Sequence, residues 1–158
     1  MYEKGVPVTI GGKTCTLVFT LAALMMLTER YGGVQEMAEA FSGPDVTEED
    51  TPEEAAQKLA AKKKAHLYGI KETPWLIATL ANQGYMLEHG PRKADDPELL
   101  TPEAVALQVL PRDMRALNAA FMEAISIGMG TLHGDGEDAE TDVVLEELEQ
   151  KNAAGAAE

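Results

Sequence analysis

The stretch from Val6 to Gly33, VPVTIGGKTCTLVFTLAALMMLTERYGG, constrains the fold of this chain more than any other. It opens with two short runs rich in β-branched residues, in which apolar and polar positions alternate with the period of a half-buried strand. Gly11 and Gly12 separate the runs, and two adjacent glycines supply the positive φ angles that a tight hairpin turn needs. The sequence therefore predicts a β-hairpin over residues 6–19.

A helix is predicted immediately after the hairpin. Thr20 offers a side-chain oxygen as N-cap and Gly32 supplies a stop, so the helix should run from Leu21 to about Tyr31. Helical spacing assigns its buried stripe to Leu21, Leu24, Met25 and Thr28, widened by Leu27 and Tyr31.

The rest of the chain shows helical periodicity. Three Thr-Pro pairs, beginning at Thr51, Thr73 and Thr101, each combine an N-cap with a proline in the first turn. Gly69 and Pro74 are expected to bracket a break between two helices, and residues 42–51 are expected to form a mobile, solvated loop. Helices are predicted over residues 34–41, 52–68, 74–89, 104–110 and 112–129.

These elements predict a mainly α-helical α+β domain in which the N-terminal hairpin packs on about five helices. A chain of 158 residues suits one core of modest size, and we expect a single globular domain over residues 1–133. Residues 134–158 carry nine acidic residues against one lysine, which predicts an acidic, disordered C-terminal tail. Within this tail, one short helix could close on a partner through Val143, Val144, Leu145 and Leu148.

Charge and composition exclude several classes of protein. A formal net charge of −14 repels the phosphates of nucleic acid and of anionic membranes, so neither is an expected partner. The longest apolar run, Leu21 to Leu27, is far too short to span a bilayer. The single cysteine, Cys15, rules out an internal disulfide, fits a reducing cytoplasm and is expected to be a buried small hydrophobe.

No motif for catalysis or for a cofactor is present in the sequence. His66, His89 and His133 lie in separate segments without ligand-spaced pairs, so no metal site is expected. The glycines of the hairpin turn lack the upstream glycine of a phosphate loop, and a strand rather than a helix follows them. The sequence therefore predicts a protein that is not an enzyme and that needs no cofactor.

The hairpin with its Gly-Gly-Lys turn, followed by LVFTL and by a helix that ends in LTERYG, resembles the start of tail assembly chaperones of long-tailed (siphovirus-type) bacteriophages and of related gene transfer agent proteins. The resemblance covers about the first fifth of the chain in detail. It implies a non-catalytic protein of the host cytoplasm that binds the tape measure protein, keeps it soluble, helps recruit tail tube subunits and is absent from the mature virion. The alternatives are a small virion structural protein and an acidic regulatory or decoy binding protein.

The partner-binding surface is expected near Leu24, Met25 and Met26 on the first helix, together with part of the helix around Trp75 and Tyr85. Three successive apolar side chains on a helix point about 100° apart, so a single core contact cannot bury all three. Methionine is flexible enough to cover varied apolar helices. The same stripe could instead join copies of the chain into a homo-oligomer.

Overall fold

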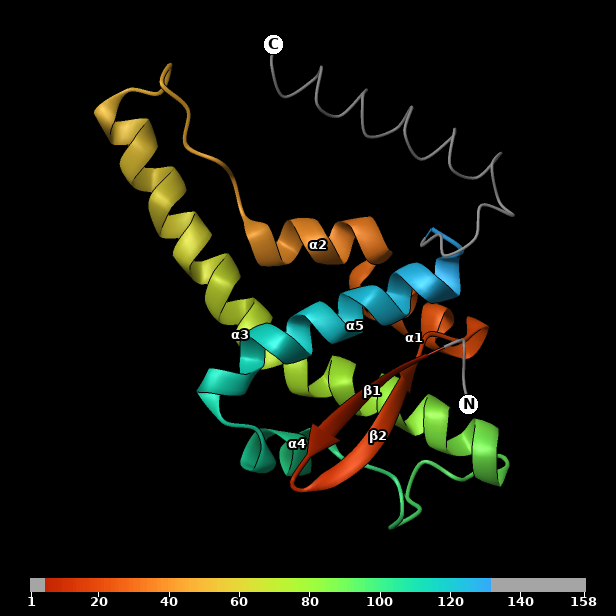
Figure 1. The fold of residues 1–158 in the computed structure, drawn as a ribbon. Helices are drawn as coiled ribbons and strands as arrows, with labels where there is room; N and C mark the ends of the chain where they lie inside the picture. Colours follow the sequence, from red (N-terminus) through yellow and green to blue (C-terminus); the bar gives the residue numbers. More distant parts are fainter. Residues whose placement is uncertain (1–4, 132–158) are drawn as a thin grey trace.

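The computed structural model describes residues 5–131, which form one two-stranded sheet, five α-helices and a short 3₁₀ helix. The elements in chain order are β1 (Gly5–Ile10), β2 (Lys13–Val18), α1 (Leu21–Tyr31), α2 (Val34–Ser42), α3 (Pro52–His89), α4 (Pro102–Gln108), η1 (Pro111–Asp113) and α5 (Met114–Met129) (Figure 1). The predicted α+β fold, a hairpin packed on five helices, is confirmed. The predicted tail over residues 134–158 and the domain boundary before it lie outside the described residues.

The hairpin forms as predicted, with β1 and β2 antiparallel and Ile10 opposite Lys13 at the turn. The turn residues Gly11 and Gly12 have φ angles of +58° and +79°, and a type I′ turn requires positive φ at both positions. β2 packs against α3 and β1 packs against α5, so the hairpin lies across two helices (Figure 1). The buried residues of this segment are Val8, Ile10, Leu17, Val18 and Phe19.

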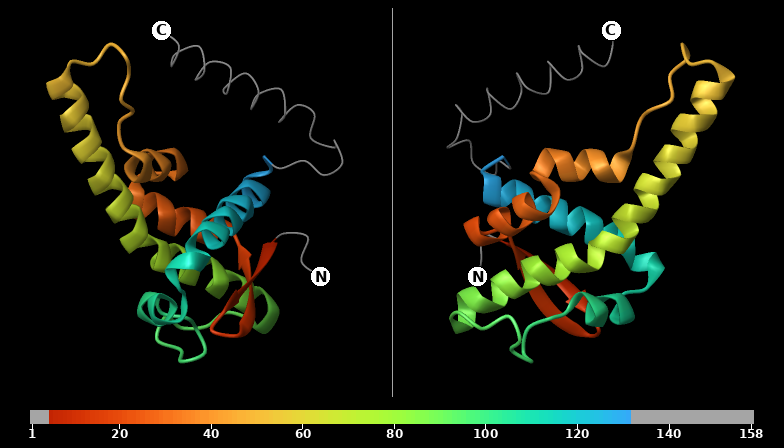
Figure 2. Two further views of the ribbon diagram at one scale, coloured as in Figure 1. Left: turned by 60° about the vertical axis from the view of Figure 1, so that its left-hand side comes forward. Right: turned by 180° about the vertical axis from the view of Figure 1, so that it is seen from behind.

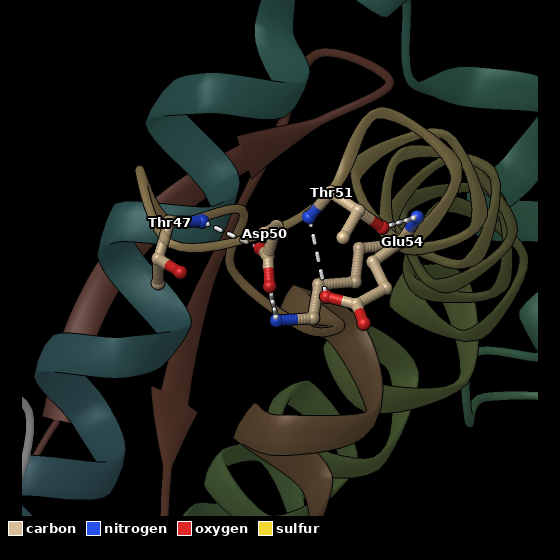
Figure 3. A network of polar contacts seen from close by, with 5 residues as sticks. Thr47, Asp50, Thr51 and Glu54 are labelled. Carbon is tan, nitrogen blue, oxygen red and sulfur yellow. Dashed lines mark hydrogen bonds and ion pairs between the residues drawn. The ribbon is translucent and has the colours of Figure 1, made fainter.

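Threonine side chains begin three of the helices. The Oγ1 atoms of Thr20 and Thr101 each accept a hydrogen bond of 3.1 Å from the backbone N–H three residues later. Thr51 forms a full capping box with Glu54, in which Thr51 Oγ1 accepts from the Glu54 N–H at 3.2 Å and the Glu54 carboxylate accepts from the Thr51 N–H at 3.3 Å (Figure 3). The caps predicted at these three threonines are confirmed.

The loop between α2 and α3 is tied to α3 by Asp50. The Asp50 carboxylate accepts hydrogen bonds from Lys58 Nζ at 2.8 Å and from the Thr47 N–H at 2.8 Å (Figure 3). The bond from Lys58 is the main reason that the pKa of Asp50 is lowered. Most loop residues are exposed, as predicted for a solvated loop, but this network holds the loop's end against the first turns of α3.

α3 is one helix of 38 residues, so the predicted break between Gly69 and Pro74 is wrong. Pro74 has no N–H for the carbonyl of Ile70, while Thr73 Oγ1 donates to the Gly69 carbonyl at 2.7 Å. An interior proline costs about 3 kcal/mol, and each fully buried large aliphatic side chain contributes roughly 1.5–3 kcal/mol. Burial in the core therefore offsets the cost of the proline. The residues that supply this burial follow Pro74 directly and are Leu76, Ile77, Ala78, Leu80 and Ala81.

The ribbon of α3 changes direction between its yellow and its green part in the right-hand view of Figure 2, and Pro74 lies in the interior of this helix. Residues 52–71 form a projecting part of the helix that has no buried residue, and we call this part the arm. Residues 72–84 pass through the core, where Gly84 faces β2 so closely that a Cβ atom would collide with the Thr16 carbonyl oxygen. The bend thus separates a core segment from an exposed one within a single helix.

α1 buries a different face from the predicted one. Ala23 and Leu27 are buried, whereas Leu21 is 73% exposed and Met25 is 65% exposed. Met25 is two positions from both Ala23 and Leu27, which places it about 160° around the helix from each of them. Half of the predicted buried stripe is therefore outward: Leu21, Met25 and Thr28 are exposed. Leu24, Leu27 and Tyr31 do pack on the core as expected.

Candidate partner-binding surfaces

Polar contacts at both ends of α1 decide which face of this helix meets the core. Thr20 Oγ1 donates to the Gln83 side-chain oxygen at the start of α1. At the other end, Tyr31 donates its hydroxyl to Glu72 Oε1 at 2.8 Å. Both partners lie on α3, so α1 runs antiparallel to the core segment of α3.

The outer face of α1, defined as Leu21, Met25 and Met26, is the first candidate binding surface. Met26 is 42% exposed, and together with Leu21 and Met25 it presents apolar side chains to solvent within two turns of helix. Single exposed apolar residues are normal, whereas contiguous apolar patches are typical of contact surfaces, which makes this group a candidate. The predicted location of exposed apolar side chains on this helix thus agrees with the structure at Met25 and Met26.

Trp75 belongs to an internal joint between α1 and α3. The Arg30 guanidinium forms two hydrogen bonds with the Glu72 carboxylate, at 2.7 and 3.1 Å, and its carbon lies 4.4 Å from the centre of the Trp75 ring. The Arg30 bond is the largest cause of the lowered pKa of Glu72, while burial, followed by the bond to Glu72, raises the pKa of Tyr31. Trp75 is half-buried, since it packs against the core and the Tyr31 ring while the Arg30 guanidinium lies over the indole ring.

Tyr85 lies in a separate cleft of about 900 Å³ between β2, α3 and the segment at residues 97–100. Its hydroxyl donates to the Glu98 carboxylate. The segment is held by Asn82, whose side chain donates to the Leu100 carbonyl at 2.9 Å and accepts from the Leu100 N–H at 2.7 Å. Cys15 lines the same cleft, and burial raises the pKa of its thiol, so at neutral pH the thiol stays in its weakly nucleophilic protonated form.

The structure does not unite the five residues that the sequence suggested for partner binding. Leu24, Met25 and Met26 lie together on α1, whereas Trp75 and Tyr85 are ten positions apart on α3, which is about 15 Å along the helix axis. Trp75 contacts the C-terminal end of α1, and Tyr85 faces the other cleft. Of the five residues, Met25 and Met26 are exposed neighbours on α1, whereas Leu24 packs against the core.

A groove along α3 is a second candidate surface, and the sequence interpretation missed it. Three adjoining hollows of about 600, 210 and 740 Å³ share His66 in their walls. We call them together the α3 groove. The outer hollow lies between α2 and the arm, and the largest lies between α3, α4 and α5. Apolar side chains predominate in the wall of the largest hollow and include Ile70, Pro74, Ile77, Val105, Val109 and Met114.

Helical periodicity along the arm could have revealed this groove. Leu59, His66 and Ile70 follow at spacings of seven and four, which places them on one face of a continuous helix. The helix predicted from the sequence ends at residue 68, so it does not include Ile70 and the pattern is not recognised. The missing signal was therefore the continuity of α3 through Pro74.

Within residues 5–131, no group of three or more His, Cys, Asp and Glu side chains is placed to hold a metal ion. The same part of the chain contains no helix that is both long and apolar enough to cross a bilayer. A scan against protein-family models, a search of curated proteins and a search of solved structures each find no match. The described residues do offer two apolar helical surfaces, and such surfaces suit the binding of another helix.

Proposed function

We propose that this protein is a non-catalytic tail assembly chaperone of a long-tailed bacteriophage or gene transfer agent, which binds the tape measure protein and keeps it soluble during tail assembly. The observation that carries the proposal is the apolar outer face of α1, with Leu21 73% exposed and Met25 65% exposed. This face lies on the same hairpin-and-helix stretch in which the sequence resembles that family.

The physical chemistry of the outer face of α1 suits a long apolar helix as partner. Covering one large aliphatic side chain contributes roughly 1.5–3 kcal/mol, so Leu21, Met25 and Met26 together could supply useful affinity. Methionine side chains adapt to different partner surfaces, which suits a protein that must cover a long sequence without a single motif. The net charge of −14 would keep a complex with an apolar protein in solution.

Co-expression with the tape measure protein tests the proposal directly. We expect the wild-type chain to raise the soluble yield of the tape measure protein and to capture it in a pull-down. Met26→Glu should weaken capture by at least about tenfold, which corresponds to about 1.4 kcal/mol, because the carboxylate would be desolvated in an apolar contact.

Met122→Glu on α5 is the matched control, since Met122 is 41% exposed and Met26 is 42% exposed. The proposal fails if the wild-type chain neither solubilises nor captures the tape measure protein, or if both variants capture it equally well. A pull-down with tail tube protein under the same conditions tests the second proposed partner.

The proposed place of action is the host cytoplasm, with the protein absent from the mature virion. Mass analysis of purified particles separates this role from that of a small virion structural protein, since a structural protein would be found in stoichiometric amounts. Self-association through the outer face of α1 is the competing use of this surface. Sedimentation of wild type and Met26→Glu without any partner distinguishes the two uses, because a smaller particle in the variant would indicate a homo-oligomer.

A further inference from the structure

The α3 groove carries a local charge opposite to that of the whole chain. The sequence has 27 acidic residues against 13 Lys and Arg, yet Lys62, Lys63 and Arg115 all line the groove. Asp45 is the one acidic residue that lines it among the described residues, and Lys62 pairs with it at 3.0 Å. Within residues 5–131, neither Lys63 nor Arg115 forms an ion pair. The rim of the groove therefore favours an acidic ligand.

The walls of the groove expose apolar surface beside these cations. Leu59 is 50% exposed and Ile70 is 47% exposed, and both line the groove. The largest hollow, of about 740 Å³, falls in the size range of ligand pockets and can receive several aliphatic side chains. An occupant of the groove should therefore combine an apolar stripe with acidic flanks, which is the pattern of an amphipathic acidic helix.

We propose that the α3 groove is the docking site of this chain's own segment from Asp138 to Glu149. The segment reads DAETDVVLEELE, with six acidic residues and no basic one. Thr141, Val144, Leu145 and Leu148 follow the spacing i, i+3, i+4 and i+7, so a helix formed on docking would carry them on one face. The apolar stripe matches the walls of the groove, and the acidic residues complement Lys63 and Arg115.

The length of the chain permits this contact within one molecule. α5 lines the groove as far as Phe121 and ends at Met129, so its last eight residues carry the chain about 12 Å away from the groove. Residues 132–137 connect the described part of the chain to the docking segment, and six extended residues span up to about 20 Å. The connection is therefore long enough to return the segment to the groove.

Docking would cover the exposed apolar walls of the groove and neutralise its cations. It uses α2, α3, α4 and α5, whereas the proposed tape measure contact uses the outer face of α1. The inference therefore does not rest on the proposed function, and either can fail without the other.

Paramagnetic relaxation in the full-length chain tests the docking. Cys15→Ser with Gln150→Cys gives a single thiol for a nitroxide spin label next to the docking segment. The methyl groups of Ile70 and Met114 report on the groove, and those of Met25 and Met26 report on the outer face of α1. We expect the label to attenuate the Ile70 and Met114 signals and to spare the two α1 signals, with a weaker effect at high salt because the ionic part of the contact is screened.

Two further variants isolate the apolar stripe from the charge of the tail. Leu145→Glu with Leu148→Glu should abolish the attenuation at Ile70 and Met114. Ala153→Glu with Ala154→Glu adds the same two charges beyond the segment and should preserve it. The methyl spectrum without the label shows whether each variant is folded.

Three results would overturn the proposal. One is the absence of attenuation in the groove, and another is attenuation that Leu145→Glu with Leu148→Glu leaves unchanged. The third comes from mixing labelled chains with separate methyl-labelled chains: attenuation that appears only between molecules would assign the occupant to a second copy.

Discussion

At the scale of single residues, Glu72 holds the end of α1 against α3. Its carboxylate accepts two hydrogen bonds from Arg30 and one from Tyr31, at 2.7, 3.1 and 2.8 Å. These bonds lower the pKa of Glu72, with the Arg30 bond as the largest cause. The ionised form is therefore the one that the folded state stabilises.

Replacing this carboxylate should make stability depend on pH in a defined direction. Because the pKa of Glu72 is lower in the folded state, its contribution is full above the unfolded pKa of about 4.3 and is lost as the pH falls through the folded value. Glu72→Gln should lower the free energy of unfolding by about 1 kcal/mol at pH 7, a size typical of exposed or partly exposed ion pairs. Urea titrations across the pH range measure this difference, which should shrink below about pH 4.

Glu29→Gln on α1 is the control, because the structure shows no hydrogen bond or ion pair for the exposed Glu29 side chain among the described residues. An equal loss in both variants, or a loss at Glu72 that persists unchanged at acidic pH, would contradict the role assigned to Glu72.

At the scale of elements, α3 is a single helix with two environments, a core segment and a projecting arm. The core segment contacts β2 at Gly84, where an added Cβ would meet the Thr16 backbone. The arm begins at the Thr51 capping box and contains no buried residue. Substitutions at the two ends of α3 should consequently have different effects.

Gly84→Ala should destabilise the fold although alanine is the better helix former. Helix propensity favours alanine by about 1 kcal/mol, but pushing β2 away from α3 should cost more, so we expect a net loss of about 1–3 kcal/mol. Gly69→Ala makes the same change in the same helix, where the nearest atom is a movable Phe41 ring carbon at 3.3 Å, and should cost less. Thermal and urea unfolding measure the stability of both variants. Equal stability of Gly84→Ala and Gly69→Ala would contradict the close packing of β2 against α3 at Gly84.

Thr51→Ala should loosen the start of the arm. The loss of an N-cap costs about 1 kcal/mol, which corresponds to about fivefold faster amide hydrogen exchange where exchange proceeds through local opening. The change should be confined to the first turns of α3. Thr47→Ala is the control, since it keeps the backbone N–H that Thr47 donates to Asp50 and leaves the Thr51 cap in place. Unchanged exchange at residues 52–58 in Thr51→Ala would contradict a stabilising cap.

At the scale of the whole molecule, the core of residues 5–131 is built from the hairpin, the buried part of α3, α5, two buried positions of α1 and one each of α2 and α4. Residues 134–158 add like charges and few apolar side chains. Removing them should therefore leave a soluble, cooperatively folded protein whose free energy of unfolding changes by no more than about 1 kcal/mol, even if docking in the α3 groove is lost. Circular dichroism and urea unfolding of a chain ending at His133 test this, and loss of cooperative unfolding would contradict it.

Short-range signals were enough to predict most of the elements. The Gly11-Gly12 turn, the caps at Thr20, Thr51 and Thr101 and the stop at Gly32 each depend on neighbours within a few residues. Such interactions form in the same way in any fold that contains the element, and the sequence alone therefore determined the hairpin, the order of the helices and most of their ends.

Tertiary structure decided which helical faces are buried and whether α3 continues through Pro74. The apolar periodicity of α1 fits two faces, and the choice between them depends on Gln83 and Glu72, which lie more than forty positions away along the chain. At Pro74 the local penalty favours a break, but burial of Leu76 and Ile77 against distant segments outweighs it. The α3 groove needs α2, α4 and α5 together, so no single stretch of sequence contains it. Burial energy depends on contacts between remote residues, and those contacts exist only once the chain has folded.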